Sequence, residues 1–309
     1  MKQEGHAARR AGSVEAAPMS APLASSAERA IDLARLRSDV PHPRLPRRSA
    51  AHRVASYVGR TAAIAGMEAR KLLHDPTELL TRAVQPALWL LVFGQVFTRI
   101  RAIPTGNMRY IDFMAPGILS QSVLFIAIFH GIAVIWERDL GILHKFLVSP
   151  TPRSALILGK ALSAGIRGLT QALIVYLLAL LLGVQMNWSL LPLLGVLAAV
   201  MLGAAFFSTF SLVIACLVKT RERFMGIGQI LTMPLFFASN AIYPISIMPG
   251  WLQVISHGNP LTYQVDALRA LMLAGGVSSY GVGSDFLILT GACAVLVAIA
   301  SRLYPKLVI

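Results

Sequence analysis

Three long stretches without a charged residue constrain this chain more than any other feature. Asp, Glu, Lys and Arg are all absent from Gly168 to Val218, from Phe224 to Val265 and from Phe113 to Trp136. The hydrocarbon core of a bilayer is about 30 Å thick and takes roughly 20 apolar residues per helical crossing, so the first stretch is long enough for two crossings. Helices of a soluble domain would interrupt such runs with charged residues on their solvent faces. The chain is therefore predicted to be an all-α integral membrane protein.

The apolar runs and the breaks between them predict six transmembrane helices. A tight polar turn from Gln185 to Ser189 separates the third span from the fourth, and its Trp188 is expected to anchor the turn at the membrane interface. The predicted spans cover about residues 79–98, 113–136, 165–184, 190–217, 225–246 and 284–303.

Two further segments precede the spans. Residues 1–52 are rich in Ala, Arg, Pro and Ser, contain no apolar run, and are predicted to form a disordered cytoplasmic tail. From Arg53 to His74, apolar residues recur at roughly helical spacing between charged ones, which predicts an amphipathic helix lying at the membrane interface. The pair Asp75-Pro76 is expected to end this helix. The transmembrane domain is accordingly predicted to cover residues 53–309.

The distribution of Lys and Arg predicts the orientation of the spans. With the N-terminus inside, the inner segments hold 22 of the 28 basic residues. The outer segments hold four, Arg99, Arg101, Arg109 and Arg269. Because Lys and Arg collect on the cytoplasmic side, both termini are predicted to be cytoplasmic, in the cell membrane of a bacterium. Contact with anionic membrane lipid then accounts for the net charge of +14, and no nucleic-acid partner is expected.

Isolated polar residues in the spans are given structural interpretations. Arg82 and Arg167 fall near the predicted inner ends of the first and third spans, where long side chains can snorkel to the interface. His130 is alone in the second span and is predicted to be a hydrogen-bonded polar residue rather than a ligand. Asp112 and Asp285 lie near predicted outer ends, so the centres of the six spans contain no acid.

The sequence also lacks the chemistry of several function classes. Acidic residues inside a membrane mark proton and ion pathways, so their absence disfavours a self-contained secondary transporter or channel, which is kept as the alternative. Gly159-Lys160-Ala161 lacks the first glycine and the hydroxyl of a P-loop, and no cluster of catalytic or metal-binding residues occurs. The chain is predicted not to be an enzyme and to hold no catalytic residue, metal or cofactor. Energy for active transport would have to come from a partner.

The segment between the second and third spans is the candidate for contact with such a partner. Leu140, Leu143 and Leu147 fall at i, i+3 and i+7, and Ser149-Pro150 follows, which predicts a short amphipathic helix. A rigid helix held between two spans can transmit a push from a bound protein. The same pattern also fits a surface helix resting on lipid.

Three segments resemble type-two ATP-binding-cassette (ABC) permeases, in particular exporters for drug resistance and for nodulation-type saccharides. The run from Trp136 to Pro150, followed by Arg153 and by Leu156 to Lys160, is similar to the family signature of an acidic-Arg start, a Gly-x-Leu, a Leu-x-x-Pro and a Gly-Lys ending. Met248 to Leu252, Asn259 to Tyr263 and Asp266 to Arg269 resemble the family's outer loop before the last span. Ala69 to Pro76 is a weaker match to its interface helix. The matches cover about residues 65–305, and the long N-terminal tail departs from the family pattern.

The resemblance implies two sets of site residues. In the family the loop between spans two and three is a coupling helix that docks on the ATPase, which implies contact or positioning roles for Glu137, Arg138, Asp139, Gly141 and Lys145. The outer segment would form re-entrant helices that cap the pathway, and a plain extracellular loop is the alternative. Its matching residues are Pro249, Gly250, Trp251, Asn259 and Pro260.

The family also implies partners and a cargo. Its members work as two permease subunits with two ABC ATPase subunits that bind ATP and Mg, so this chain would be an exporter permease paired with a second permease. The expected cargo is a hydrophobic drug-like molecule or a lipid-linked saccharide. Spans one and five would face the second permease. Polar residues there are pathway candidates, although such groups also serve as hydrogen bonds between helices: Gln85, Gln95, Gln229, Thr232, Ser239 and Asn240.

Overall fold

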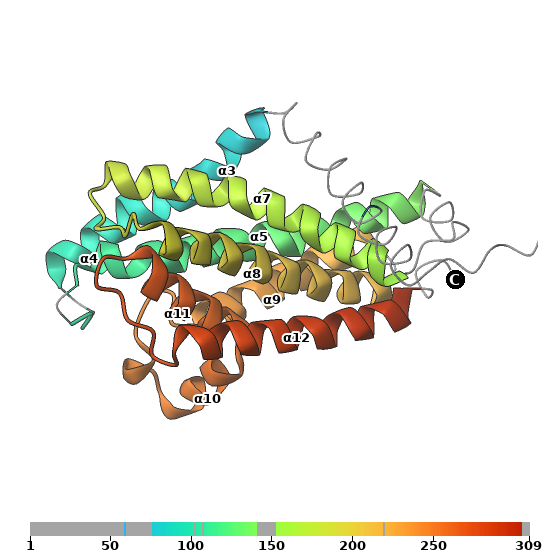
Figure 1. The fold of residues 1–309 in the computed structure, drawn as a ribbon. Helices are drawn as coiled ribbons and strands as arrows, with labels where there is room; N and C mark the ends of the chain where they lie inside the picture. Colours follow the sequence, from blue (N-terminus) through green and yellow to red (C-terminus); the bar gives the residue numbers. More distant parts are fainter. Residues whose placement is uncertain are drawn as a thin grey trace, which may run out of the picture. The chain divides into compact units, whose positions relative to one another are not determined.

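The computed structural model describes residues 76–101, 103–106, 108–140, 153–218 and 220–304, together with Gly59. Regular structure in these ranges is helical, apart from one isolated bridge between Met186 and Leu273. The predicted tail and nearly all of the predicted interfacial helix lie outside them. The elements (Figure 1) are α3 (Pro76–Leu88), the π-helical turn η1 (Trp89–Gly94), α4 (Gln95–Ile100), α5 (Tyr110–Asp139), α7 (Arg153–Leu181), α8 (Leu190–Leu217), α9 (Arg221–Phe237), the 3-10 turn η2 (Ile245–Ile247), α10 (Gly250–Gly258), α11 (Pro260–Met272) and α12 (Val282–Leu303).

Helices long and apolar enough to cross a membrane confirm the all-α membrane class. Within the described ranges there are five, Thr81–Ile100, Tyr110–Asp139, Ser154–Leu181, Leu190–Leu217 and Val282–Leu303. They stand at the places of the predicted first, second, third, fourth and sixth spans. α9 stands at the place of the fifth, but its 17 residues rise only about 26 Å, less than the core of about 30 Å. The count of six crossings therefore stays a prediction.

Two helix boundaries differ from the predicted spans. α7 begins at Arg153, well before residue 165, because the helix continues without a break through Lys160 and the mostly apolar residues around it. Arg167, expected near the inner end of its span, consequently lies near the midpoint of this 29-residue helix. The first span is not one regular helix: α3 contains Pro86 and gives way at Trp89 to the π-helical turn η1. A proline lacks the N–H of the helical ladder, so a local change of hydrogen bonding near it is expected.

The central helix of the fold is α5, which packs against α7, α8, α9 and α11. Most of its side chains are buried, and glycines let neighbouring backbones approach closely. A Cβ atom added to Gly117 would lie 2.2 Å from the backbone oxygen of Ala241. One added to Gly131 would lie 2.1 Å from the hydroxyl oxygen of Ser211. The turn after α9 and helix α8 therefore rest directly on the α5 backbone.

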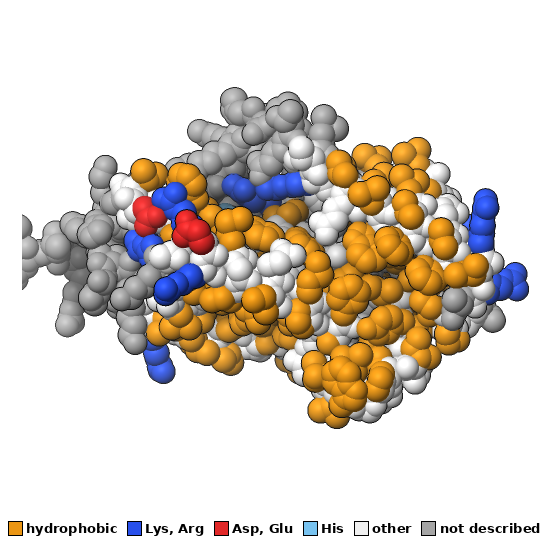
Figure 2. Space-filling view, turned by 180° about the vertical axis from the view of Figure 1, so that it is seen from behind, with side chains coloured by type: hydrophobic (Ala, Val, Ile, Leu, Met, Phe, Trp, Pro, Cys, Tyr) orange, Lys and Arg blue, Asp and Glu red, His pale blue; other side chains and the backbone are white. Residues whose placement is uncertain are grey.

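An exposed apolar surface runs over α3, η1, α4 and α9, and we call it the α3/α9 face. The part formed by α3, η1 and α4 meets the part formed by α9 where the rings of Trp89 and Phe236 lie 5.8 Å apart between centroids. Such a surface is stable against lipid or against another membrane helix. Figure 2 shows hydrophobic side chains over much of the molecule as seen from behind. The exposed apolar residues of the α3/α9 face include Val84, Leu88, Leu91, Val92, Phe93, Val96, Met225, Ile230, Met233 and Phe237.

Candidate functional site

The predicted coupling residues begin at the end of α5, where charged residues from three helices meet. Glu137 Oε2 lies 2.6 Å from Lys160 Nζ of α7, and both side chains are largely buried. Water screens a buried ion pair less than an exposed one, so removing either partner would leave a poorly solvated charge at this position. It joins the end of α5 to the first third of α7.

A second set of contacts joins the end of α5 to the start of α9. Asp139 Oδ2 accepts hydrogen bonds from Nε and Nη2 of Arg221 at 3.0 and 2.7 Å. Asp139 Oδ1 accepts two more from Arg138, at 3.2 and 3.1 Å. The Arg221 guanidinium also lies 3.7 Å from the ring centroid of Trp136. A guanidinium that both chelates a carboxylate and stacks on an aromatic ring is held in one orientation.

We call Glu137, Arg138, Asp139, Lys160 and Arg221 the α5 charge network. Three of its members were predicted as coupling residues, and the fold places them together. Their contact with a partner stays a prediction. Lys160 and Arg221 were not predicted to be their partners. The available signal was that both are basic residues at the same predicted membrane face as the acids.

The other two predicted coupling residues, Gly141 and Lys145, lie outside the described residues, as does the rest of the predicted coupling helix after Leu140. The α5 charge network therefore lies directly before this segment in the chain. The shape of the segment itself stays a prediction.

The predicted outer segment folds as two short helices, α10 and α11, which meet at Asn259. Asn259 Nδ2 donates to the backbone oxygens of Leu235 and Ala238 at 2.6 and 3.0 Å, and its Oδ1 accepts from the backbone nitrogen of Leu261 at 3.0 Å. This side chain caps α11 and ties it to the end of α9. Pro260 begins α11, where its missing N–H would be unpaired in any case.

The remaining outer-segment residues lie at the start of α10. Pro249 is its N-cap, and Gly250 and Trp251 are its first two residues. All three are exposed, and Trp251 is 67% exposed. The segment is thus helical, as the prediction of short helices requires. Its insertion into the membrane stays a prediction.

The six pathway candidates separate into buried and accessible residues. Thr232, Ser239 and Asn240 are buried. The hydroxyls of Thr232 and Ser239 donate to backbone oxygens one turn earlier, those of Gly228 and Phe236, which favours a packing role.

The other three candidates are accessible. Gln95 and Gln229 are exposed on the α3/α9 face, and Gln85 lines a cavity. These positions suit contact with a partner helix or a cargo, and the pathway role of all six stays a prediction.

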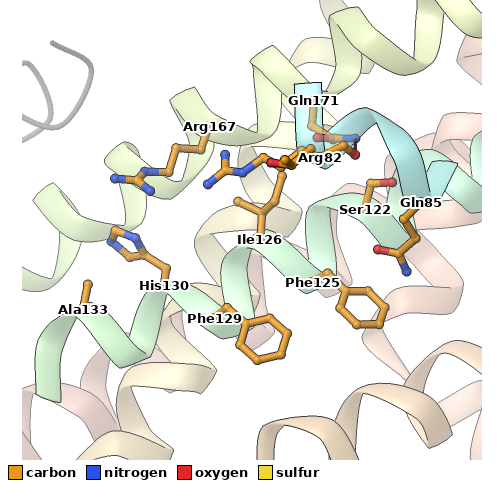
Figure 3. A pocket seen from close by; sticks show the side chains of 11 residues that line it. Arg82, Gln85, Ser122, Phe125, Ile126, Phe129, His130, Ala133, Arg167 and Gln171 are labelled. Carbon is orange, nitrogen blue, oxygen red and sulfur yellow. Dashed lines mark hydrogen bonds between the residues drawn. The ribbon is translucent and has the colours of Figure 1, made fainter. Parts of the chain in front are cut away.

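The cavity that holds Gln85 has a volume of about 480 Å³ and lies between α3, α5 and α7. In Figure 3 the guanidinium groups of Arg82 and Arg167 point into the same space, on the side of α5 that carries His130. The grouping of these three residues was not predicted, because nothing in their spacing indicates that α3 and α7 converge. The lining residues are Thr81, Arg82, Gln85, Ser122, Phe125, Ile126, Phe129, His130, Ala133, Arg167 and Gln171.

Two buried carboxylates, those of Asp266 and Asp285, lie at the predicted outer end of the fold. The Ser278 hydroxyl lies 2.8 Å from Asp266 Oδ2 and 3.0 Å from Asp285 Oδ2. Asp266 Oδ2 also accepts from the backbone nitrogens of Ser279 and Tyr280 at 2.7 and 3.1 Å. The loop between α11 and α12 is therefore held by Asp266. The burial of this acid was not predicted, because its partners lie in a loop without a sequence signature.

Comparison with known proteins identifies the family. A family model described as ABC-2 type transporter matches residues 61–273, as the sequence resemblance predicted. The putative transport permease ycf38 of Cyanophora paradoxa is 31% identical over 205 residues, 65% of this chain and 70% of the relative. The daunorubicin resistance ABC transporter permease protein DrrB1 of Streptomyces coeruleorubidus is 28% identical over 75% of this chain and 81% of its own. The probable doxorubicin resistance ABC transporter permease protein DrrC of Mycobacterium tuberculosis is 27% identical, over 74% and 83%. This chain, a multi-pass membrane protein, thus belongs to the ABC-2 type transporter family.

Proposed function

We propose that the chain is the membrane-spanning permease subunit of an exporter, driven by ATP that a separate ABC ATPase subunit binds with Mg and hydrolyses. Membership of the ABC-2 family supports this function, as do relatives named as permeases of drug-resistance transporters. The proposed cargo is a hydrophobic drug-like molecule or a lipid-linked saccharide, moved out of the cytoplasm. The proposed location is the cell membrane of a bacterium, with both termini in the cytoplasm.

The observation that carries the proposal is the α5 charge network. The chain leaves α5 directly into the segment expected to dock on the ATPase, and Glu137 and Asp139 join that exit to α7 and α9. A displacement of the segment would therefore act on three helices together. A partner can switch the pathway between two conformations only by binding one of them more tightly than the other. Helices that are linked by ion pairs can change between these conformations together.

A second permease subunit is proposed to cover the α3/α9 face. Six spans rarely enclose a pathway for a large solute, so we place the pathway at a subunit interface. The exposed apolar residues of this face, together with Gln95 and Gln229, support that position. The second subunit is either another copy of this chain or a different permease.

The test is reconstitution of the chain in lipid vesicles, with and without its ABC ATPase. We expect ATP-dependent accumulation of daunorubicin only when both subunits are present, and no accumulation with an ATPase that lacks its P-loop lysine. Co-purification of the two subunits, measured in parallel, separates a wrong cargo from a wrong partner. Transport by the chain alone without nucleotide would favour the alternative, a secondary transporter or channel.

A further inference from the structure

Tyr304, the first residue after α12, is fully buried among the ends of four helices at the predicted cytoplasmic side. Figure 1 shows the ends of α5 and α12 and the start of α7 at the same end of the bundle. The Tyr304 ring belongs to one apolar cluster with side chains of α5, α7, α8 and α12, which are Val134, Leu156, Ile157, Leu212 and Ala300. The end of α12 is therefore held by packing against the other three helices.

This cluster lies beside the ion pair of Glu137 and Lys160. Val134 precedes Glu137 by one turn of α5, and Ile157 precedes Lys160 by one turn of α7. Residues one turn apart share a face of a helix, so both charged side chains border the cluster that contains Tyr304. Burial raises the pKa of the Tyr304 hydroxyl, and the negative charge of Glu137 raises it further. The hydroxyl therefore keeps its proton and is a hydrogen-bond donor near a carboxylate.

The Tyr304 hydroxyl has no hydrogen-bond partner within the part of the chain that the structure describes. A buried polar group without a partner costs free energy, and a phenylalanine would fill the same space without that cost. Packing therefore accounts for the ring of Tyr304 and not for its hydroxyl. An acceptor that reaches the hydroxyl in a second conformation would account for it.

Glu137 is placed to be that acceptor. It lies in the last turn of α5, and Lys160 lies in the first third of α7, so the two residues stand on either side of the predicted docking segment. A displacement of this segment would change the distance between their side chains. Tyr304 follows α12, which is not joined to the segment. A carboxylate has several acceptor positions, and a buried one that loses its only partner is costly.

We propose that Tyr304 is a positioning residue of the α5 charge network, whose hydroxyl donates to Glu137 when the ion pair of Glu137 and Lys160 opens. This exchange of partners keeps the carboxylate hydrogen-bonded in both conformations and includes α12 in the movement. Its role in transport rests on the proposed function, whereas the exchange itself is a property of this chain alone.

The exchange is tested by thermal denaturation of the full-length chain in detergent, without ATPase or nucleotide. In the otherwise unaltered chain, Tyr304→Phe should raise the melting temperature or leave it unchanged, because it removes an unpaired hydroxyl. In a Lys160→Met chain, Glu137 has lost its cation and the hydroxyl becomes its partner. Tyr304→Phe should then lower the melting temperature. A tyrosine that only packs would have the same effect in both chains.

Tyr176→Phe is the matched control. The Tyr176 hydroxyl is also buried and unpaired within the described ranges, and its ring lies beside Trp188 at the predicted outer side, 6.3 Å away between centroids. This change should have equal effects in the unaltered and the Lys160→Met chain. Equal effects of Tyr304→Phe in the two chains would overturn the exchange of partners.

The role in transport is measured in the exporter assembled with its ABC ATPase. Tyr304→Phe should reduce cargo-stimulated ATP hydrolysis about tenfold, the effect of one hydrogen bond to a charged group, although the melting temperature does not fall. Tyr176→Phe should leave the hydrolysis unchanged. Undiminished hydrolysis in Tyr304→Phe would overturn the positioning role, and this measurement decides alone if the Lys160→Met chain cannot be purified.

A failure of the proposed function would look different. The unaltered exporter would then show no cargo-stimulated hydrolysis at all. The melting temperatures of the Tyr304→Phe and Lys160→Met variants would still decide whether Tyr304 is the second partner of Glu137.

Discussion

Asn259 Nδ2 lies 2.6 Å from the backbone oxygen of Leu235, 24 residues earlier in the chain. The same nitrogen donates to Ala238, and the side-chain oxygen accepts from the backbone of Leu261. One amide thus completes the hydrogen bonding at the end of α9 and at the start of α11. Unpaired backbone groups are costly in apolar surroundings, so this side chain is a main determinant of the outer segment's position.

Asn259→Ala should destabilise the fold by about 2–4 kcal/mol, because it removes a helix cap and takes a side-chain donor from the buried carbonyl group of Ala238 and the partly buried one of Leu235. The measurement is the thermal denaturation of the detergent-purified chain. Gln229→Ala removes an exposed amide from α9 and is the matched control. Equal melting temperatures of the two variants would show that Asn259 does not anchor the segment.

Gly117→Ala should also destabilise, by about 2 kcal/mol or more, because the new methyl group would lie 2.2 Å from the backbone oxygen of Ala241. Backbone cannot move aside as a flexible side chain can. Gly291→Ala in α12 is the control, since a Cβ atom there meets no atom within 4 Å and the change raises helix propensity. In thermal denaturation, the melting temperature of Gly117→Ala should fall, whereas that of Gly291→Ala should rise or stay unchanged.

The class of the molecule and most of its helices were predictable because membrane burial acts on composition alone. An uncharged run such as Gly168 to Val218 indicates burial in a membrane, and this inference does not require knowing which helices pack beside it. Helix ends were less predictable: α7 begins at Arg153, because hydropathy marks the apolar run and not the length of the helix. The interruption of the first span near Pro86 had a signal in the proline, but its π-helical form did not.

The site was predictable in part. Glu137 and Asp139 were identified by their place in a family signature. Their partners were not, because ion pairs over 23 and 82 residues depend on which helices become neighbours. The convergence of Arg82 and Arg167 has the same origin, since it requires α3 to lie beside α7.

Asp266→Ala should loosen the loop between α11 and α12, because the backbone N–H groups of Ser279 and Tyr280 would lose their shared acceptor. We expect faster cleavage in this loop when the chain is treated with proteinase K in detergent. Ser284→Ala, an exposed change at the start of α12, is the control and should leave the cleavage rate unaltered. Equal rates in both variants would contradict the role assigned to Asp266.

Charge reversal at Glu137 and Asp139 should abolish cargo-stimulated ATP hydrolysis by the assembled exporter while leaving membrane insertion intact, because the new lysines would repel Lys160 and Arg221. Hydrolysis by the isolated ATPase is measured beside it and should not change. Glu137→Lys alone should reduce coupling, and adding Lys160→Glu should restore part of it, because the ion pair returns with opposite polarity. Glu222→Lys, at an exposed acid in the first turn of α9, is the matched control. Unchanged coupled hydrolysis in the double reversal would remove the α5 charge network from the mechanism. Failure of Lys160→Glu to restore activity would instead place the role of Glu137 in direct contact with the ATPase.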